Sequence, residues 1–277
     1  IYAVGDATEK HDALDNSATL IPLANIANRQ GRVVADLICG KKIRAVASQA
    51  TAIVKIFDLT VATTGWNEKK AKAAGLDYVV VHTHPSHHAG YYPGAQGMSI
   101  KIIVDKKTQE ILGAQAVGRE GVDKRIDVIA TAMRGGLTAP ELADLELAYA
   151  PPFGSAKDPV NMLGYIYENV LNGVTPTAQW NEVNSLVSQG WTVVDVRSKG
   201  EFDRGHIPNS INISIDEMRE RINEVPKEKI LVTCQVGQRG HAATRLLREM
   251  GYNAVNLDGG YMTWSHSPAN TKVSEHV

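Results

Sequence analysis

One cysteine constrains this chain more than any other residue. Cys234 directly follows the apolar run Ile230–Val232, which is typical of a buried strand, and four residues separate it from Arg239. The segment His241–Leu247 then has a helical pattern, so we expect Cys234 in a loop between a strand end and a helix start. Loop N–H groups, the positive end of the helix dipole and Arg239 would together stabilise an anionic sulfur. We therefore predict that Cys234 and Arg239 are catalytic, the alternative being an inert cysteine packed in the core.

Other motifs frame this loop. They are the segments Val193–Phe202, Gly205–Asn212 and Asn256–Trp264. Together with the Cys234 loop they resemble a rhodanese, a sulfurtransferase domain, which we place at residues 174–277. The resemblance implies an α/β fold with a central parallel sheet, and a Cys234 persulfide that carries sulfane sulfur. Within it, Asp195, Arg197 and Glu201 are expected to pair and to order a strand-to-helix turn.

The length of the loop separates two chemistries on this fold. Sulfurtransferases resemble C-x4-R, a tight loop that fits one sulfur atom. The related cell-cycle phosphatases and arsenate reductases carry C-x5-R, whose wider loop cradles a tetrahedral oxyanion. Four residues lie between Cys234 and Arg239, so the spacing favours sulfur transfer over phosphate ester hydrolysis.

The beginning of the chain carries a second pattern. Ile1–Ala7 reads as a strand that ends in a Gly-Asp turn at Asp6, and the turn Pro22-Leu23-Ala24 precedes a helix expected over Asn25–Cys39 and ended by Gly40. This pair resembles the second flavin motif of the pyridine nucleotide-disulfide reductases. The resemblance implies that Asp6 binds the ribityl chain of FAD. It also implies that the helix after Pro22, Leu23 and Ala24 points its N-terminus at the flavin pyrimidine. We assign residues 1–45 to the remnant of an FAD-binding domain, and we expect Cys39 to be a core residue.

Two other parts of such an enzyme are missing from the sequence. A G-x-G-x-x-G motif between a strand and a helix does not occur, nor does a C-x4-C redox pair. We therefore expect this chain to be the C-terminal portion of a longer protein, cut before its second flavin motif. The resemblance implies that the parent protein uses NADH or NADPH.

The middle segment, residues 46–173, is predicted to form an α+β domain. Strands are expected at 51–61, 78–82, 99–104 and 110–117, and helices at 66–74, 123–134 and 138–147. The order of these elements and the stretch Ile111–Gly118 resemble the dimerisation domain of the same reductases. The resemblance implies a homodimer that forms through residues 46–173.

The tyrosines of this segment help to distinguish between classes of reductase. Glutathione and lipoamide reductases carry a His-Pro…Glu dyad near the end of this domain, but the corresponding stretch Ala148–Asn161 has no histidine. Its Tyr-Ala-Pro-Pro-Phe pattern, with Tyr91 and Tyr92 earlier, resembles coenzyme A-disulfide reductases. The resemblance implies that Tyr149 and one of Tyr91 and Tyr92 reach towards the sulfur of CoA in the partner's active site. The alternative is that these tyrosines only pack an interface.

A cluster of histidines suggests a metal at first sight. His82, His84, His87 and His88 resemble the H-x-H-x-D-H motif of metallo-β-lactamase-fold hydrolases, but Ser86 occupies the position of the aspartate ligand. Because later ligands of that fold have no clear counterparts, we predict no metal site. We expect an interface loop whose histidines are solvated or help to attract the phosphates of CoA.

The composition agrees with this interpretation. The 277 residues carry a net charge of −1 without basic or acidic blocks, which argues against nucleic acid and membrane partners. Two cysteines, one in a reactive setting, favour a reducing, cytoplasmic compartment. We predict the C-terminal portion of an FAD- and NAD(P)H-dependent reductase of CoA-linked disulfides or persulfides with a fused rhodanese. The alternatives are an NADH oxidase or polysulfide reductase of the same architecture, and a rhodanese that only docks.

Overall fold

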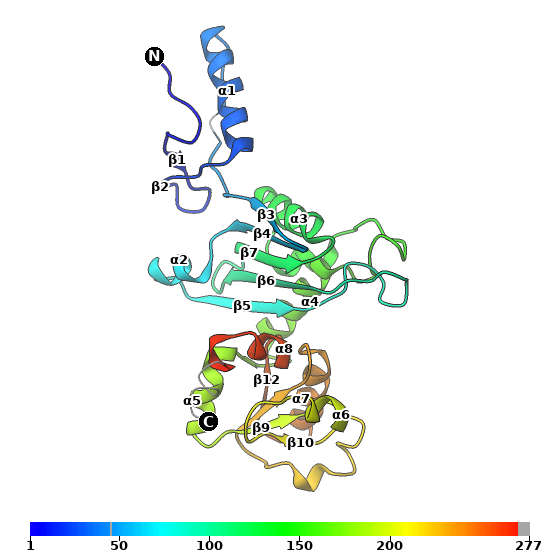
Figure 1. Ribbon diagram of the computed structural model, residues 1–277. Helices are drawn as coiled ribbons and strands as arrows, with labels where there is room; N and C mark the ends of the chain where they lie inside the picture. Colours follow the sequence, from blue (N-terminus) through cyan, green and yellow to red (C-terminus); the bar gives the residue numbers. More distant parts are fainter. Residues whose placement is uncertain (45, 271–277) are drawn as a thin grey trace. The chain divides into compact units, whose positions relative to one another are not determined.

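The structure, a computed structural model, describes residues 1–44 and 46–270. Residue 45 and residues 271–277, which the predicted domains include, lie outside the described residues. The chain divides into two compact units, residues 1–79 with 85–160 and residues 80–84 with 161–277 (Figure 1). The boundaries that we drew at residues 45 and 173 stay a prediction. Within the described residues, helices of the length and apolarity needed to cross a membrane do not occur.

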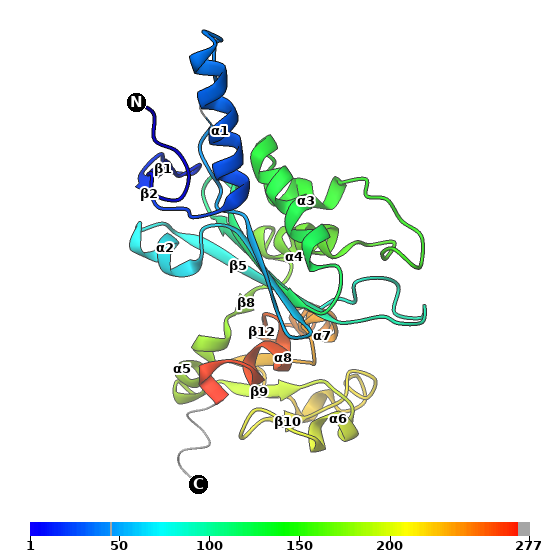
Figure 2. The ribbon, with the colours of Figure 1, turned by 45° about the horizontal axis from the view of Figure 1, so that its top comes forward.

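The first unit is built around an antiparallel sheet. Its elements are β1 (Lys10–His11), β2 (Ala18–Thr19), α1 (Ala24–Ile38), β3 (Ala52–Ile56), β4 (Leu59–Gly65), α2 (Glu68–Ala73), the beginning of β5 (Tyr78–Thr83, whose residues 80–83 belong to the second unit), β6 (Met98–Asp105), β7 (Ile111–Gly118), α3 (Val122–Gly135) and the 3₁₀ helix η1 (Pro140–Asp144). The strand order is β3-β4-β7-β6-β5, and β4–β7 and β6–β7 pair antiparallel. Helix α3 packs on one face of the sheet, against β4 and β7 (Figures 1 and 2).

The core of this unit lies under its sheet, and the first half of β6 shows the alternation of a strand with one buried face. In β6, Ile100 and Ile102 are buried, whereas the intervening Lys101 is only partly buried. Ile126 and Ile129, on the buried side of α3, are also withdrawn from solvent. The α+β fold predicted for this segment is confirmed.

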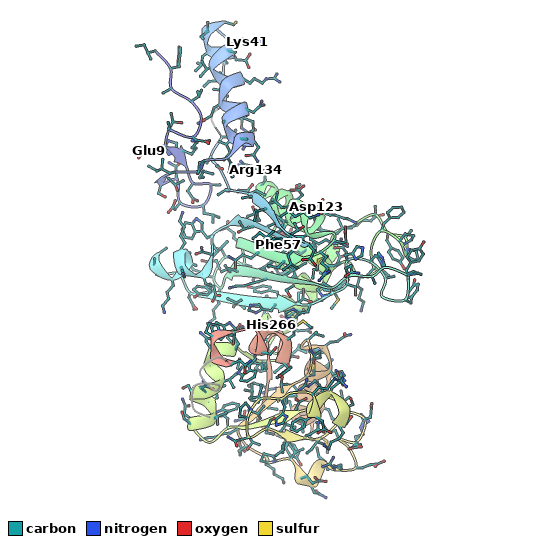
Figure 3. All side chains as sticks on the ribbon, in the orientation of Figure 1. Glu9, Lys41, Phe57, Asp123, Arg134 and His266 are labelled. Atoms are coloured by element: carbon teal, nitrogen blue, oxygen red, sulfur yellow. The ribbon has the colours of Figure 1, made fainter. Side chains whose placement is uncertain are left out.

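Three local expectations for this unit were wrong. Residues 51–61 form two strands rather than one, because Phe57, with φ +54°, and Asp58 reverse the chain between the paired residues Ile56 and Leu59 (Figure 3). Residues 138–147 contain only the short 3₁₀ helix η1. Residues 1–4 are not a strand, since the described residues provide no neighbour to pair with them.

Helix α1 begins and ends close to where the sequence predicts. Its C-cap is Cys39, followed by Gly40 at φ +71°. The expectation that Cys39 is a core residue was wrong, because Cys39 is exposed. Ile26 is the buried residue of this helix and Ile38 is exposed, so the apolar side of α1 is left uncovered by the described residues.

The second unit contains an all-parallel sheet. Its further elements are α4 (Pro159–Leu171, most of which belongs here), β8 (Thr177–Ala178), η2 (Trp180–Glu182), α5 (Val183–Ser188), β9 (Thr192–Asp195), α6 (Lys199–Asp203), β10 (Ile211–Asn212), η3 (Ile222–Glu224), β11 (Ile230–Thr233), α7 (Gln238–Glu249), β12 (Ala254–Leu257) and α8 (Gly260–Ser265). The order is β10-β9-β11-β12-β8, with every pairing parallel. The central parallel sheet predicted from the sequence is confirmed.

Both faces of this sheet are covered. Val232 packs in one core cluster with Leu247 of α7, and Leu231 packs in another with Val183 of α5 and Trp264 of α8. A strand that is buried on both faces reads as a continuous apolar run, which explains the sequence of β11. The central strand β11 therefore ends at the carboxyl edge of the sheet, where α/β folds place their ligands.

Candidate active site

Cys234 follows the last residue of β11, and α7 begins at Gln238. The predicted strand–loop–helix arrangement is therefore confirmed. The thiol is fully buried, and its Sγ accepts a hydrogen bond from the N–H of Gly237 at 3.2 Å. Gly237 adopts φ +93°, which L side chains rarely adopt, and it is the N-cap of α7. The loop thus turns a backbone N–H and a helix N-terminus towards the sulfur.

The start of α8 holds the other side of this loop. The N–H of Tyr261 donates to the carbonyl of Cys234 at 2.7 Å, and the N–H of Met262 donates to the carbonyl of Gln235 at 2.9 Å. At Gly260, a Cβ would lie 2.4 Å from the Cys234 carbonyl oxygen and 2.9 Å from the Gly237 nitrogen, so only glycine fits. The loop carbonyls are therefore tied to α8, away from the sulfur.

Arg239 lies in the first turn of α7, but its guanidinium does not face the sulfur unopposed. It donates to both carboxylate oxygens of Glu201, at 2.6 and 2.8 Å. The hydrogen bond from Arg239 is the main cause that lowers the pKa of Glu201 to about 2, and the same pair raises the pKa of Arg239. Glu201 also accepts from the N–H of Ser198, which closes a capping box at the start of α6. Arg239 therefore links α6 to the Cys234 loop. Its partner Glu201 was not expected from the sequence.

The expected pairing of Asp195, Arg197 and Glu201 is only half right. Arg197 is buried and binds both carboxylate oxygens of Asp195, at 2.7 to 3.0 Å, whereas Glu201 pairs with Arg239. Arg197 also donates to the side chain of Gln235 in the loop at 3.0 Å. Its guanidinium carbon lies 4.2 Å above the Tyr261 ring. Sequence reasoning missed these contacts of Gln235 and Tyr261, for which no local pattern exists.

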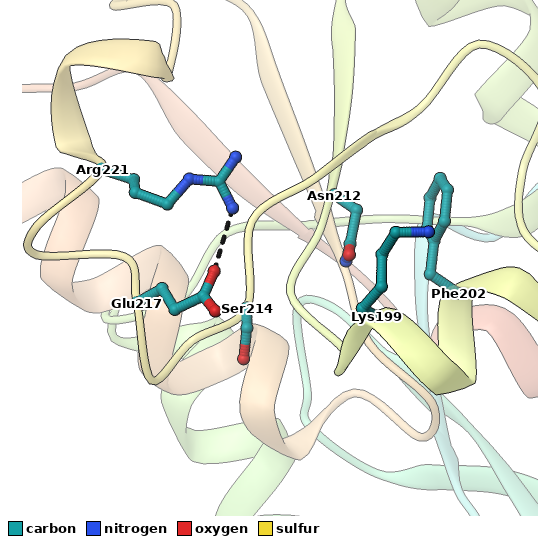
Figure 4. Close-up of a pocket in the computed structure, with 6 residues that line it drawn as sticks. All are labelled: Lys199, Phe202, Asn212, Ser214, Glu217 and Arg221. Atoms are coloured by element: carbon teal, nitrogen blue, oxygen red, sulfur yellow. Dashed lines mark hydrogen bonds and ion pairs between the residues drawn. The ribbon is translucent and has the colours of Figure 1, made fainter.

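A cavity of about 340 Å³ lies beside α6, lined by Lys199, Phe202, Asn212, Ser214, Glu217 and Arg221 (Figure 4). Its charged groups are paired: Arg221 binds Glu217, and Lys199 binds Asp203. The Asn212 amide donates to the carbonyls of Asp195 and Arg197, which fixes this wall of the cavity to the end of β9.

The histidines of this cluster each have a different hydrogen-bond partner. In the second unit, His82 Nδ1 lies 2.7 Å from the buried carboxylate of Asp258, and His84 Nε2 lies 2.7 Å from the hydroxyl of Thr263. Burial lowers the pKa of His84 to about 4. In the first unit, the ring of His88 is buried and lies 3.0 Å from the carbonyl of Ala89. Each of these three rings therefore has a hydrogen-bond partner within the protein.

The structure brings two of the predicted tyrosines together. The hydroxyls of Tyr91 and Tyr149 are 3.4 Å apart, although the residues are separated by 58 positions. Both rings are exposed, by 78% and 47%. Tyr92 points elsewhere, with its ring edge-on to His88 at 5.6 Å. The geometry therefore selects Tyr91 over Tyr92 as the companion of Tyr149.

The two halves of the predicted flavin motif also lie together. The N–H of Gly5, at φ +87°, donates to the Gln30 side chain of α1 at 2.9 Å, and the adjacent Asp6 is exposed. Leu23 is the N-cap of α1 and offers no side-chain hydrogen bond to the helix amides, while Pro22 and Ala24 flank it. The structure thus offers two groups that a flavin could use, an exposed carboxylate next to a residue held by the second turn of α1, and the first amides of α1, which lack a side-chain cap.

Comparison with known proteins identifies both domains. Residues 51–159 belong to the pyridine nucleotide-disulphide oxidoreductase dimerisation domains, and residues 179–267 belong to the rhodanese-like domains. Coenzyme A disulfide reductase from Staphylococcus aureus is 41% identical over 166 residues, which are 60% of this chain and 37% of the relative.

Two solved structures are similar over almost the whole chain. Reduced CoADR-RHD of Bacillus anthracis is 50% identical with a TM-score of 0.92, covering 96% of this chain and 48% of that one. An NAD-dependent persulfide reductase from A. fulgidus is 38% identical with a TM-score of 0.88, covering 95% and 48%. The chain thus spans about half the length of these relatives or less.

Proposed function

We propose that this chain, a reductase dimerisation domain followed by a rhodanese-like domain, is the carboxyl-terminal part of an FAD- and NAD(P)H-dependent reductase of CoA-linked disulfides or persulfides. The proposal is supported by the names of the similar proteins, a coenzyme A disulfide reductase and an NAD-dependent persulfide reductase. It is also supported by the paired hydroxyls of Tyr91 and Tyr149. Two phenols at this spacing offer hydrogen bonds to one anionic sulfur.

Sulfur transfer at Cys234 is the step that this chain carries out itself. The Cys234 thiolate attacks the outer sulfur of a donor R–S–S⁻, the S–S bond of the donor breaks, and R–S⁻ leaves. The product is a Cys234 persulfide, which a second thiolate attacks in the same way. The observation that carries this proposal is the hydrogen bond from Gly237 to Sγ within a loop of four residues. Backbone N–H groups stabilise the anionic sulfur before and after transfer.

Asp6 and the turn Pro22-Leu23-Ala24 would hold FAD, Asp6 on the ribityl chain and the α1 N-terminus on the pyrimidine. When bound, the flavin supplies the electrons that reduce the S–S bond of the substrate. Tyr149, with Tyr91, would hydrogen-bond the CoA sulfur. We further propose a homodimer through residues 46–173 and a cytoplasmic location, because a reactive thiol that cycles through a persulfide needs a reducing compartment.

The test uses the two cysteines of the chain as variant and control. Cys234→Ser is expected to abolish transfer of sulfane sulfur from thiosulfate to cyanide, while Cys39→Ser retains it. Circular dichroism should be the same for both variants, since each change is nearly isosteric. Transfer by Cys234→Ser at the wild-type rate would refute the proposed chemistry and favour a docking role for the rhodanese domain.

A further inference from the structure

Two loops of the first unit carry the tyrosine pair. Tyr91 lies in the loop of residues 85–97, and Tyr149 lies in the loop of residues 148–158. Both rings are largely exposed, so burial does not fix the side chains. The spacing of the two hydroxyls therefore depends on how the two loop backbones are held relative to each other.

Arg125 forms hydrogen bonds to both of these loops. It belongs to the first turns of α3, and it is 1% exposed. Its Nη2 donates to the carbonyl of His87 in the first loop at 2.7 Å, and to the carboxylate of Asp158 at the end of the second loop at 2.9 Å. One buried guanidinium thus bonds to both loops.

The surroundings of Arg125 fix its position. Gly121, at φ +70°, precedes α3, and a Cβ there would lie 2.7 Å from Arg125 Nη1 and 3.0 Å from the His87 Cβ. The other carboxylate oxygen of Asp158 accepts the N–H of Val160 at 3.0 Å. A buried, hydrogen-bonded ion pair of this kind is costly to break from one side, because the remaining charge is left unpaired.

We infer that Arg125 is a positioning residue, which sets the separation of the Tyr91 and Tyr149 hydroxyls so that both address one anionic group. The sulfur of CoA as that group rests on the proposed function. Without a bound anion, one hydroxyl donates to the other, and each phenol can turn its single proton towards an anion that approaches the pair. The hydrogen bond to Tyr91 raises the pKa of Tyr149, which agrees with Tyr149 as the donor within the unliganded pair.

Lysine cannot replace this function fully. Its ammonium is a point charge that can still pair with Asp158, whereas the planar fork of arginine spans two acceptors. Arg125→Lys therefore keeps the ion pair and loosens the loop of Tyr91. Arg125→Met removes both bonds with little change in volume.

The first experiment follows the tyrosine pair in this chain by NMR with 13Cζ-labelled tyrosine. In the wild type, Tyr149 should titrate at higher pH than it does in Tyr91→Phe. Arg125→Met and Arg125→Lys should abolish or reduce this difference. Arg134→Lys, which changes an exposed arginine on the same helix whose guanidinium binds the Ala47 carbonyl, should keep it (Figure 3). An unchanged difference in folded Arg125→Lys or Arg125→Met overturns the inference.

The second experiment uses the complete reductase. Arg125→Lys should lower turnover on CoA disulfide about tenfold, the loss expected for one charge-assisted hydrogen bond to a sulfur that becomes anionic when the S–S bond breaks. Flavin reduction by NAD(P)H and sulfur transfer at Cys234 should stay at the wild-type rate, which excludes general unfolding. If the coupling of the tyrosines is lost while turnover on CoA disulfide stays the same, Arg125 still positions the pair, and the CoA function proposed for the tyrosines is refuted. If Arg125→Met does not fold, Arg125→Lys decides both experiments.

Discussion

The ion pair between Glu201 and Arg239 was not expected from the sequence, and the substitution Glu201→Gln tests whether it stabilises the site. Glu201→Gln removes the charge that faces Arg239. The substitution keeps the capping box of α6, because glutamine closes this motif as glutamate does. The variant therefore tests the charge and not the helix start.

The expected loss of stability follows from the pKa of Glu201. This pKa is lowered from 4.5 to about 2, and a difference of about 2.5 units corresponds to about 3.4 kcal/mol. The side chains of Glu201 and Arg239 are 23% and 38% exposed, so solvent screening reduces this to about 1–2 kcal/mol. Because the folded pKa is depressed, the contribution is complete above pH 4.5 and is lost as the pH falls through about 2.

Urea unfolding at neutral pH and near pH 2 measures this contribution. Glu201→Gln should unfold more easily than wild type at neutral pH, and the difference should shrink towards zero near pH 2. Glu224→Gln is the matched control, because Glu224 likewise pairs with an arginine, Arg221, but its side chain is 55% exposed. Its cost should stay below that of Glu201→Gln. Equal stability of Glu201→Gln and wild type at neutral pH, or a difference that persists in acid, would show that the pair does not stabilise the fold.

The same variant has a catalytic consequence. Without Glu201 the charge of Arg239 is uncompensated, so it should favour the thiolate of Cys234, and the pH of half-maximal sulfur transfer should fall. A pH–rate profile of the thiosulfate–cyanide reaction measures this shift. An unchanged or upward-shifted profile would mean that Arg239 does not act on the sulfur.

Two further changes test the loop and the tyrosines. Gly260→Ala places a Cβ against the carbonyl of Cys234 and should cost about 1–3 kcal/mol of unfolding free energy and most of the sulfur transfer. Gly251→Ala, also at positive φ but with open space around its Cβ, is its control in thermal unfolding, and equal losses in the two variants would contradict the close packing. Tyr149→Phe in the complete reductase should lower turnover on CoA-linked disulfides by about one to two decades, with flavin reduction by NAD(P)H unchanged. Turnover equal to wild type would leave Tyr149 a packing residue.

The parts of this chain that sequence predicted are those with local causes. The apolar run before Cys234, the helical pattern after it and the glycine after Cys39 each act within a few residues. They placed β11, the loop, α7 and the end of α1 close to their observed positions. The prediction of a single strand over residues 51–61 was wrong because it too relied on local sequence. Phe57-Asp58 forms the turn between β3 and β4 but is not a typical turn sequence.

The parts that sequence could not predict depend on partners far along the chain. Glu201 and Arg239 are 38 positions apart, as are Arg197 and Gln235. Charge alone permits either acid to pair with either arginine, and only the strand order β9-β11 decides which pairs form. The exposure of Cys39 has a similar origin, because periodicity defines the apolar side of a helix but not what covers it.

The distribution of charge around Cys234 finally bears on the choice between sulfur and phosphate chemistry. Arg239 is neutralised by Glu201, and Arg197 by Asp195. Among the described residues, the hydrogen-bond donor to Sγ is the uncharged N–H of Gly237. A phosphoryl group carries close to two negative charges at neutral pH and is bound by charged arginine forks. A persulfide carries one charge on a single sulfur, which backbone N–H groups and a helix N-terminus suffice to stabilise. Because both arginines are already compensated, the electrostatics of the loop favour sulfur transfer independently of its length.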